Sequence, residues 1–226
     1  MTIRDYENFD KSLSSLYKDV YPQPSDKGHT AWAKLAIESM HINDVESVLD
    51  VGCGVGFCQD IFASIGVQDY LGITASYEDQ MGASKSGKNV ILGGMTYIPK
   101  NSNAFDLVFA RHILEHSPFP IITLMEWRRV SRRNLLLIAP NPDYWGWAGK
   151  NHYSMANPEQ LWWWLRRAGW MVMDEKEFKT SHPKFISTYS NNEKRLEEGK
   201  KLIEIPGAPQ IVEYWYVCEK AEPITI

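Results

Sequence analysis

Three glycines at alternate positions, directly after a short apolar run, carry the clearest chemical signal in this sequence. Residues 48–51 are β-branched or apolar except for Asp50, and a helical pattern begins soon after the glycines. In such a strand, turn and helix a ligand can approach the backbone, because glycine tolerates positive φ and has no Cβ. Asp50 can accept hydrogen bonds from that ligand or from the turn amides. The glycines are Gly52, Gly54 and Gly56.

The turn differs from a nicotinamide dinucleotide fingerprint, which needs a third glycine three positions after the second, where Phe57 stands. Its order, Asp-x-Gly-x-Gly-x-Gly from Asp50 to Gly56, resembles the first motif of the class I S-adenosylmethionine (SAM) methyltransferases. The resemblance implies that Asp50, the three glycines and Cys53 bind SAM. An ordinary strand-to-helix turn is the alternative.

Residues 72–80, after the second expected strand, depart from most class I methyltransferases. Those enzymes place an acidic residue at the strand end to hold the ribose hydroxyls, and this sequence has Thr74 there. The segment resembles the Gly-Val-Thr-x-Ser-x-x-Gln arrangement of the cyclopropane-synthase-like and sterol-methyltransferase-like branches. That resemblance implies Gln80 on the ribose side, with Glu78 as a weaker candidate. Thr74 either bonds a ribose hydroxyl or caps the following helix.

Two further segments extend the methyltransferase resemblance, the second of them to the type 11 (ubiquinone-biosynthesis-like) family. Residues 93–96 follow the third strand, where relatives hold the adenine ring, which implies Met95 on its face and Thr96 near its edge; a plain loop is the alternative. Residues 105–116 resemble the Phe-Asp-x-Val…Leu-Glu-His segment of the family. The residues implied beside the methionine part of SAM and its methyl group are Ala110, Arg111 and His112.

The same segment contains a rival motif, because residues 112–116 spell the inverted zincin pattern His-x-x-Glu-His. On a helix, His112 and His116 would share one face and bind zinc, leaving Glu115 as the base. A serine and a proline follow directly, so little helix is available to present them. We therefore expect no metal here, and we interpret His116 as a structural imidazole bonded to nearby backbone.

The acceptor side is predicted from two polar segments. Asn141 and Tyr144 lie in an expected turn after the fifth strand and should line the substrate side. A stretch that begins at His152 and Tyr153 resembles the His-Tyr-x-x-x-x-Pro-Glu-Gln-Leu sequence of type 11 enzymes, which implies both as polar groups near the acceptor. If the acceptor must lose a proton, His112 or His152 is the expected base.

Strands alternate with helices along the chain, which predicts an α/β sheet covered on both faces. With the class I resemblance, this implies a Rossmann-like doubly wound sheet of seven mostly parallel strands with an antiparallel last strand. Ligands of such sheets bind beyond the carboxyl ends of the strands. The expected strands are residues 46–51, 70–73, 89–92, 105–109, 135–139, 170–177 and 213–219, and the expected helices are 26–40, 56–65, 76–84, 120–130 and 157–168.

The chain length suits one domain. We expect an N-terminal arm and helix over residues 1–44 and a SAM-binding domain over residues 45–226. The last two strands are separated by about residues 179–211, too many for a hairpin loop, so we interpret this segment as an insertion.

Composition limits which partners the protein is expected to bind and which cellular compartment it is expected to occupy. The net charge of −4 argues against broad binding of nucleic acid, and the dense basic cluster at residues 128–133 is interpreted as a solvated helix end. No apolar run reaches the roughly 18 residues that span a bilayer, and the N-terminus lacks a signal-peptide core. Three cysteines without a pairing pattern suit a reducing cytoplasm.

These patterns predict a SAM-dependent methyltransferase acting on a small-molecule acceptor, whose identity is open, as is the oligomeric state. A non-catalytic scaffold of the same fold is the alternative, since the non-acidic Thr74 leaves room for it. A zinc hydrolase that uses the His-x-x-Glu-His motif ranks third.

Overall fold

The computed structural model describes residues 16, 27–40, 44–146, 151–180 and 210–222. Its seven-stranded sheet has the order β3-β2-β1-β4-β5-β7-β6, and among these strands β7 alone runs in the direction opposite to the others. This arrangement confirms the predicted doubly wound sheet with an antiparallel last strand. The strands are β1 (Ser47–Val51), β2 (Asp69–Thr74), β3 (Val90–Leu92), β4 (Phe105–Arg111), β5 (Ser131–Pro140), β6 (Trp170–Thr180) and β7 (Gln210–Lys220).

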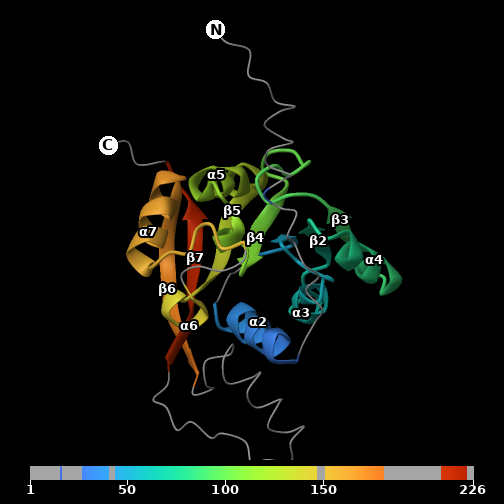
Figure 1. Ribbon diagram of the computed structural model, residues 1–226. Helices are drawn as coiled ribbons and strands as arrows, with labels where there is room; N and C mark the ends of the chain where they lie inside the picture. The colour runs from blue at the N-terminus through green and yellow to red at the C-terminus, as the bar shows by residue number, and fades with distance from the viewer. Residues whose placement is uncertain (1–15, 17–26, 41–43, 147–150, 181–209, 223–226) are drawn as a thin grey trace, which may run out of the picture.

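Helices cover both faces of the sheet (Figure 1). One face packs against α2 (Lys27–Ser39), α3 (Cys58–Ser64) and α4 (Tyr77–Lys85), and the other against α5 (Pro120–Val130) and α7 (Pro158–Arg167). A one-turn helix, α6 (Pro142–Trp145), follows β5, where the sequence predicted only a turn. A 3₁₀ turn, η1 (Leu114–His116), follows β4.

The two apolar cores follow from alternation along the buried strands. In β1, Leu49 and Val51 belong to the core under α5 and α7, whereas Val48 belongs to the core under α2 and α3. Asp50 alternates with Leu49 and Val51 and so points toward the α3 side, where Tyr70 of β2 meets it. A carboxyl group is thereby buried directly beneath the turn that follows β1.

The end caps of α7 confirm the predicted bounds of that helix. Asn157 and Gln160 form a reciprocal capping box, and Pro158 occupies the first turn. Gly169 follows the helix with φ +85°, a left-handed conformation that favours glycine.

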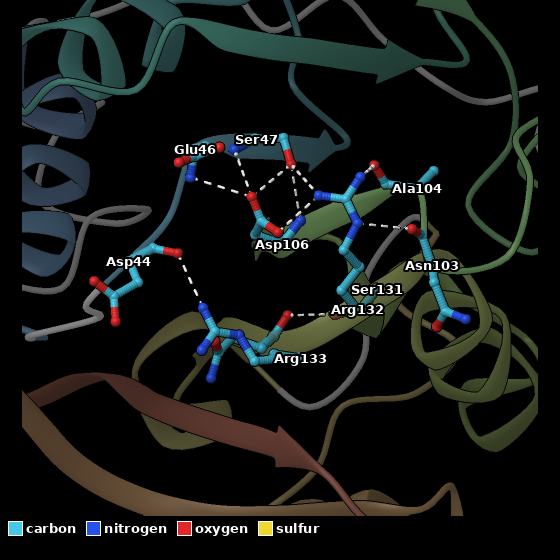
Figure 2. A network of polar contacts seen from close by, with 10 residues as sticks. Asp44, Glu46, Ser47, Asn103, Ala104, Asp106, Ser131, Arg132 and Arg133 are labelled. Carbon is cyan, nitrogen blue, oxygen red and sulfur yellow. Dashed lines mark hydrogen bonds and ion pairs between the residues drawn. The ribbon is translucent and has the colours of Figure 1, made fainter.

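The amino-terminal ends of the central strands are joined by buried and half-buried polar contacts (Figure 2). Asp106 at the start of β4 accepts hydrogen bonds from the backbone N–H of Glu46 (3.2 Å) and of Ser47 (3.0 Å). Arg132 of β5 pairs with the Asp106 carboxylate at 2.8 Å and donates to the carbonyl groups of Asn103 and Ala104. Asp106 thus links the starts of β1, β4 and β5.

The arginines of residues 128–133 are exposed or half-buried at the end of α5, as interpreted from the sequence, and they also bond backbone carbonyl groups. Besides Arg132, Arg128 donates to the carbonyl oxygens of Gly169 and Ala221, Arg129 to that of Ile98, and Arg133 to that of Asp44. Backbone carbonyl groups at strand and helix ends need donors, and these guanidinium groups supply them.

Two predicted regions lie mainly outside the described residues. They are the N-terminal arm, except for Leu16, and residues 181–209 of the expected insertion. Within the part of the chain that is described, no helix is long and apolar enough to cross a membrane.

Candidate active site

A cavity of about 360 Å³ lies at the carboxyl ends of the parallel strands. Because β1 lies between β2 and β4, the chain order reverses there, and open α/β sheets form their binding crevice at such a point. The cavity is lined by ten of the residues named from the sequence: Asp50, Gly52, Cys53, Gly54, Thr74, Met95, Arg111, His112, His152 and Tyr153.

The glycine turn after β1 forms one wall of this cavity. Gly52, Gly54 and Gly56 all have positive φ, at 75°, 54° and 76°. A Cβ on Gly52 would lie 2.6 Å from Cγ1 of Ile113, so this position excludes side chains by contact as well as by conformation. The N–H groups of Gly52 and Cys53 both donate to the Ile73 carbonyl, which fixes the turn against β2.

Asp50 lies beneath this turn and is 2% exposed. Its Oδ2 accepts a hydrogen bond of 2.6 Å from the Tyr70 hydroxyl. Burial raises the pKa of Asp50 to about 7, and hydrogen bonds from Tyr70 and Cys58 with the charge of Arg111 oppose that shift only in part. The carboxyl group therefore exchanges a proton near neutral pH and responds to any charge placed in the cavity.

At the end of β2, the residues that line the cavity differ from those predicted for the ribose side. Thr74 is buried and lines the cavity, but the N-cap of α4 is Ser76, whose hydroxyl accepts from the N–H of Asp79. Asp79 is also buried and lines the cavity, whereas Gln80 does not and donates to Ser84 one turn on. Asp79 was not predicted from the sequence, although an acidic residue in the first turn of a helix after β2 was a usable signal.

A buried charge network lies at the end of β4. Arg111 donates to Glu213 at 2.6 Å, His112 Nε2 lies 2.8 Å from the same carboxylate oxygen, and the Trp215 indole donates to the other oxygen at 2.9 Å. Glu213 is fully buried; burial acts to raise its pKa, but the Arg111 charge and these hydrogen bonds hold it at about 2. Sequence reasoning missed Glu213, which stands out as the one carboxylate among the central residues of an otherwise apolar β7.

His112 itself adopts an unusual conformation. It has φ 50°, in the left-handed region that non-glycine residues rarely occupy, and its ring packs edge-on against Trp145 at 5.1 Å between centroids. Burial and the Arg111 charge lower the pKa of His112 to about 4, although Glu213 acts to raise it. The imidazole is therefore neutral near pH 7, and it is a weak base.

Glu115 and two histidines form a second group at the cavity. Burial raises the pKa of Glu115 to about 8. His116 Nδ1 lies 3.0 Å from the Asn151 carbonyl oxygen, which confirms its interpretation as an imidazole bonded to backbone. The His152 ring lies 5.1 Å from that of His116, and burial lowers the pKa of both imidazoles.

The zinc alternative fails on geometry. Residues 112–116 form a turn with a left-handed His112 followed by a 3₁₀ segment, so His112 and His116 share no α-helical face. Their rings contact Glu213 and the Asn151 carbonyl respectively. Among the described residues, no group of three or more His, Cys, Asp or Glu side chains could hold a metal ion.

Seven candidate site residues named from the sequence do not line the cavity, and their assigned roles stay predictions. Asn141 is the N-cap of α6, and its side chain bonds Ile211 and Tyr214. Ala110 belongs to the core under α5 and α7. The others are Gly56, Glu78, Gln80, Thr96 and Tyr144. Tyr153 does line the cavity, and its hydroxyl donates to the Leu16 carbonyl at 3.0 Å.

Residues 49–139 match the family model described as a methyltransferase domain, Methyltransf_11. This match identifies residues 49–139 as a methyltransferase domain. Among solved structures, the SAM-dependent methyltransferase from Archaeoglobus fulgidus is 16% identical, with TM-score 0.64 and coverage of 96% of this chain and 100% of that chain. A SAM-dependent methyltransferase from Mesorhizobium loti is 14% identical, with TM-score 0.59 and coverage of 84% and 98%. The [4+2]-cyclase SpnF is 19% identical, with TM-score 0.62 and coverage of 97% and 94%. No curated protein matches the sequence.

SAM is the methyl donor of this methyltransferase, and the cavity fits it. The turn at Gly52 leaves backbone open to a ligand where a Cβ would collide with Ile113. The Thr74 hydroxyl and the Asp79 carboxyl supply polar groups at the end of β2, as ribose hydroxyls require. The donor is already activated, so the protein has mainly to align the acceptor and exclude water.

Proposed function

We propose that the methyltransferase binds SAM along the ends of β1, β2 and β3 and methylates a small molecule held at the ends of β4 and β5. One observation carries the proposal: the glycine turn and His112 border the same cavity. The cavity volume is in the range of small-molecule sites. The proposed donor-side residues are Asp50, Gly52, Cys53, Gly54, Thr74, Asp79 and Met95.

The acceptor side is proposed to comprise His112, Trp145, His152 and Tyr153, which line the same cavity. Leu16 lines the same side and accepts the hydrogen bond of Tyr153. His112 and His152 remain the candidate bases, although the low pKa of His112 favours positioning over proton removal.

Two features support a small acceptor in a reducing cytoplasm. The guanidinium groups of the basic cluster donate hydrogen bonds to backbone carbonyl groups, which argues against a nucleic-acid site there. The four residues are Arg128, Arg129, Arg132 and Arg133. The three cysteines are buried and free.

Titration calorimetry of SAM and S-adenosylhomocysteine tests the donor site. Wild type should bind both, and Gly52→Ala should lose binding because its Cβ meets Ile113. Gly87→Ala is a matched control, since Gly87 also has positive φ (69°) but its Cβ would meet nothing within 4 Å. Asp50→Ala should also weaken binding. Absence of binding to the folded wild type would sink the proposal.

A further inference from the structure

Glu115 is a buried carboxyl group that nothing in the donor site accounts for. It is 4% exposed and lines the cavity, and its Oε2 is buried without a hydrogen-bond partner among the described residues. Its other oxygen lies 3.8 Å from His116 Nε2, beyond hydrogen-bond distance. A buried acceptor of this kind costs free energy unless a ligand satisfies it.

The charges around the cavity limit what that ligand can be. Arg111 is the only Arg or Lys among the described residues that line the cavity, and Glu213 already pairs with it. Two other carboxyl groups, Asp50 and Asp79, line the donor side. An acceptor carrying a phosphate or carboxylate would therefore meet an Arg111 whose charge Glu213 already balances, although its Nε has no hydrogen-bond partner within the described part of the chain, and would lie near carboxyl groups.

We propose that the methyl acceptor of this cavity is an amine and that Glu115 binds its nitrogen. This inference rests on the proposed function. An ammonium group donates hydrogen bonds to a buried carboxylate and supplies the positive charge that balances it. The cavity is also lined by Trp145, Ile113 and Leu16, which suit an apolar or aromatic body attached to that nitrogen.

The transfer balances without a further reactant. Near pH 7 the free Glu115 carries a proton, because burial raises its pKa to about 8, and it releases that proton to solvent when the ammonium binds. The ammonium then gives one proton to the Glu115 carboxylate, which leaves a neutral amine beside a neutral acid. Burial favours this sharing, because it raises the pKa of Glu115 toward that of an amine. The nitrogen lone pair then forms the new N–C bond, the methyl C–S bond breaks, and its electron pair stays on sulfur. The positive charge passes from sulfur to the methylated nitrogen.

The test uses three probes that differ only in their polar group: 2-phenylethylamine, 2-phenylethanol and phenylacetate. Each is titrated into the full chain saturated with S-adenosylhomocysteine, and into the Glu115→Gln variant. Wild type should bind the amine at least about tenfold more tightly than the other two. Glu115→Gln preserves the shape of the side chain and should remove that preference while its affinity for S-adenosylhomocysteine stays within about twofold of wild type.

Glu159→Gln, on the exposed start of α7, is the control and should keep the amine preference. The inference is overturned if the alcohol or the carboxylate binds as well as the amine, if the preference survives in Glu115→Gln, or if no amine binding occurs at the highest soluble concentration. Failure of S-adenosylhomocysteine to bind wild type would instead remove the proposed function, so the two failures are distinct.

Discussion

At the scale of single residues, His112 combines backbone strain with a fixed side chain. A left-handed conformation costs a non-glycine residue on the order of 1 kcal/mol, and it persists only where the surroundings impose it. Here the surroundings include the Glu213 carboxylate, 2.8 Å from Nε2, and the Trp145 ring, which packs edge-on against the imidazole. Such positions concentrate where a protein holds a group ready for a ligand.

Replacing His112 by Asn should separate positioning from folding. Asn tolerates the left-handed conformation better than most residues, so the backbone turn should persist while the imidazole is lost. We expect turnover to fall by about 10²-fold or more, with SAM affinity within a few-fold of wild type. Steady-state kinetics and calorimetry measure the two effects, and unchanged turnover would remove His112 from the reaction.

The residue scale also shows what the sequence can and cannot predict. The glycine turn was predictable because a positive φ restricts the choice of amino acid locally. Glu213 was not, since its partner Arg111 is 102 positions away and only the pairing of β5 with β7 brings the two strands near. Gln80 and Asp79 are adjacent in sequence, and which of them faces the cavity depends on where Ser76 starts α4.

At the scale of elements, the fold was more readily predicted than the site. Strands buried on both faces show as continuous apolar runs, and helices show by their period and caps. The bounds shifted where tertiary contacts extend an element: β5 begins at Ser131 instead of residue 135, because Arg132 bonds Asp106 and the carbonyl groups before β4. The sequence of an arginine cluster does not show which backbone carbonyl groups its side chains will bond, because those groups lie on other elements.

Asp106 should account for part of the acid sensitivity of these strands. Burial acts to raise its pKa, but Arg132, Ser47 and the backbone N–H groups hold it at about 2, below the 3.8 of a free side chain. Its stabilisation is therefore complete above about pH 4 and is lost as the pH falls from 4 to 2. Asp106→Asn should lower the free energy of unfolding by about 2 kcal/mol at pH 7.

Urea unfolding at several pH values measures this contribution, and the difference between wild type and Asp106→Asn should vanish near pH 2. Asp69→Asn, at the exposed start of β2, is the control and should change stability by less than about 0.5 kcal/mol. A difference that stays constant down to pH 2 would contradict the assignment to ionised Asp106.

At the scale of the whole molecule, the cavity joins elements that are distant in sequence. Its walls come from the turn after β1, the end of β2, the loop after β3, the end of β4 and the segment before α7. At the amino-terminal ends of these strands, Asp106 and the arginines join β1, β4 and β5 (Figure 2). Stability and ligand binding are thus placed at opposite ends of the same strands.

Ligand binding should therefore stabilise the molecule unevenly. At 100 times its Kd, S-adenosylhomocysteine adds about 2.7 kcal/mol to the free energy of unfolding, which should raise Tm by roughly 5 to 10 °C for a chain of this size.

Hydrogen exchange should slow most at residues 52–57, 74–79 and 111–116, which border the cavity. The α7 helix has its own capping box, and among its residues 158–167 none lines the cavity, so its amides should change little and serve as the internal reference. Uniform slowing along the chain, α7 included, would mean that the ligand acts through global stability and that its site is not localised to these loops.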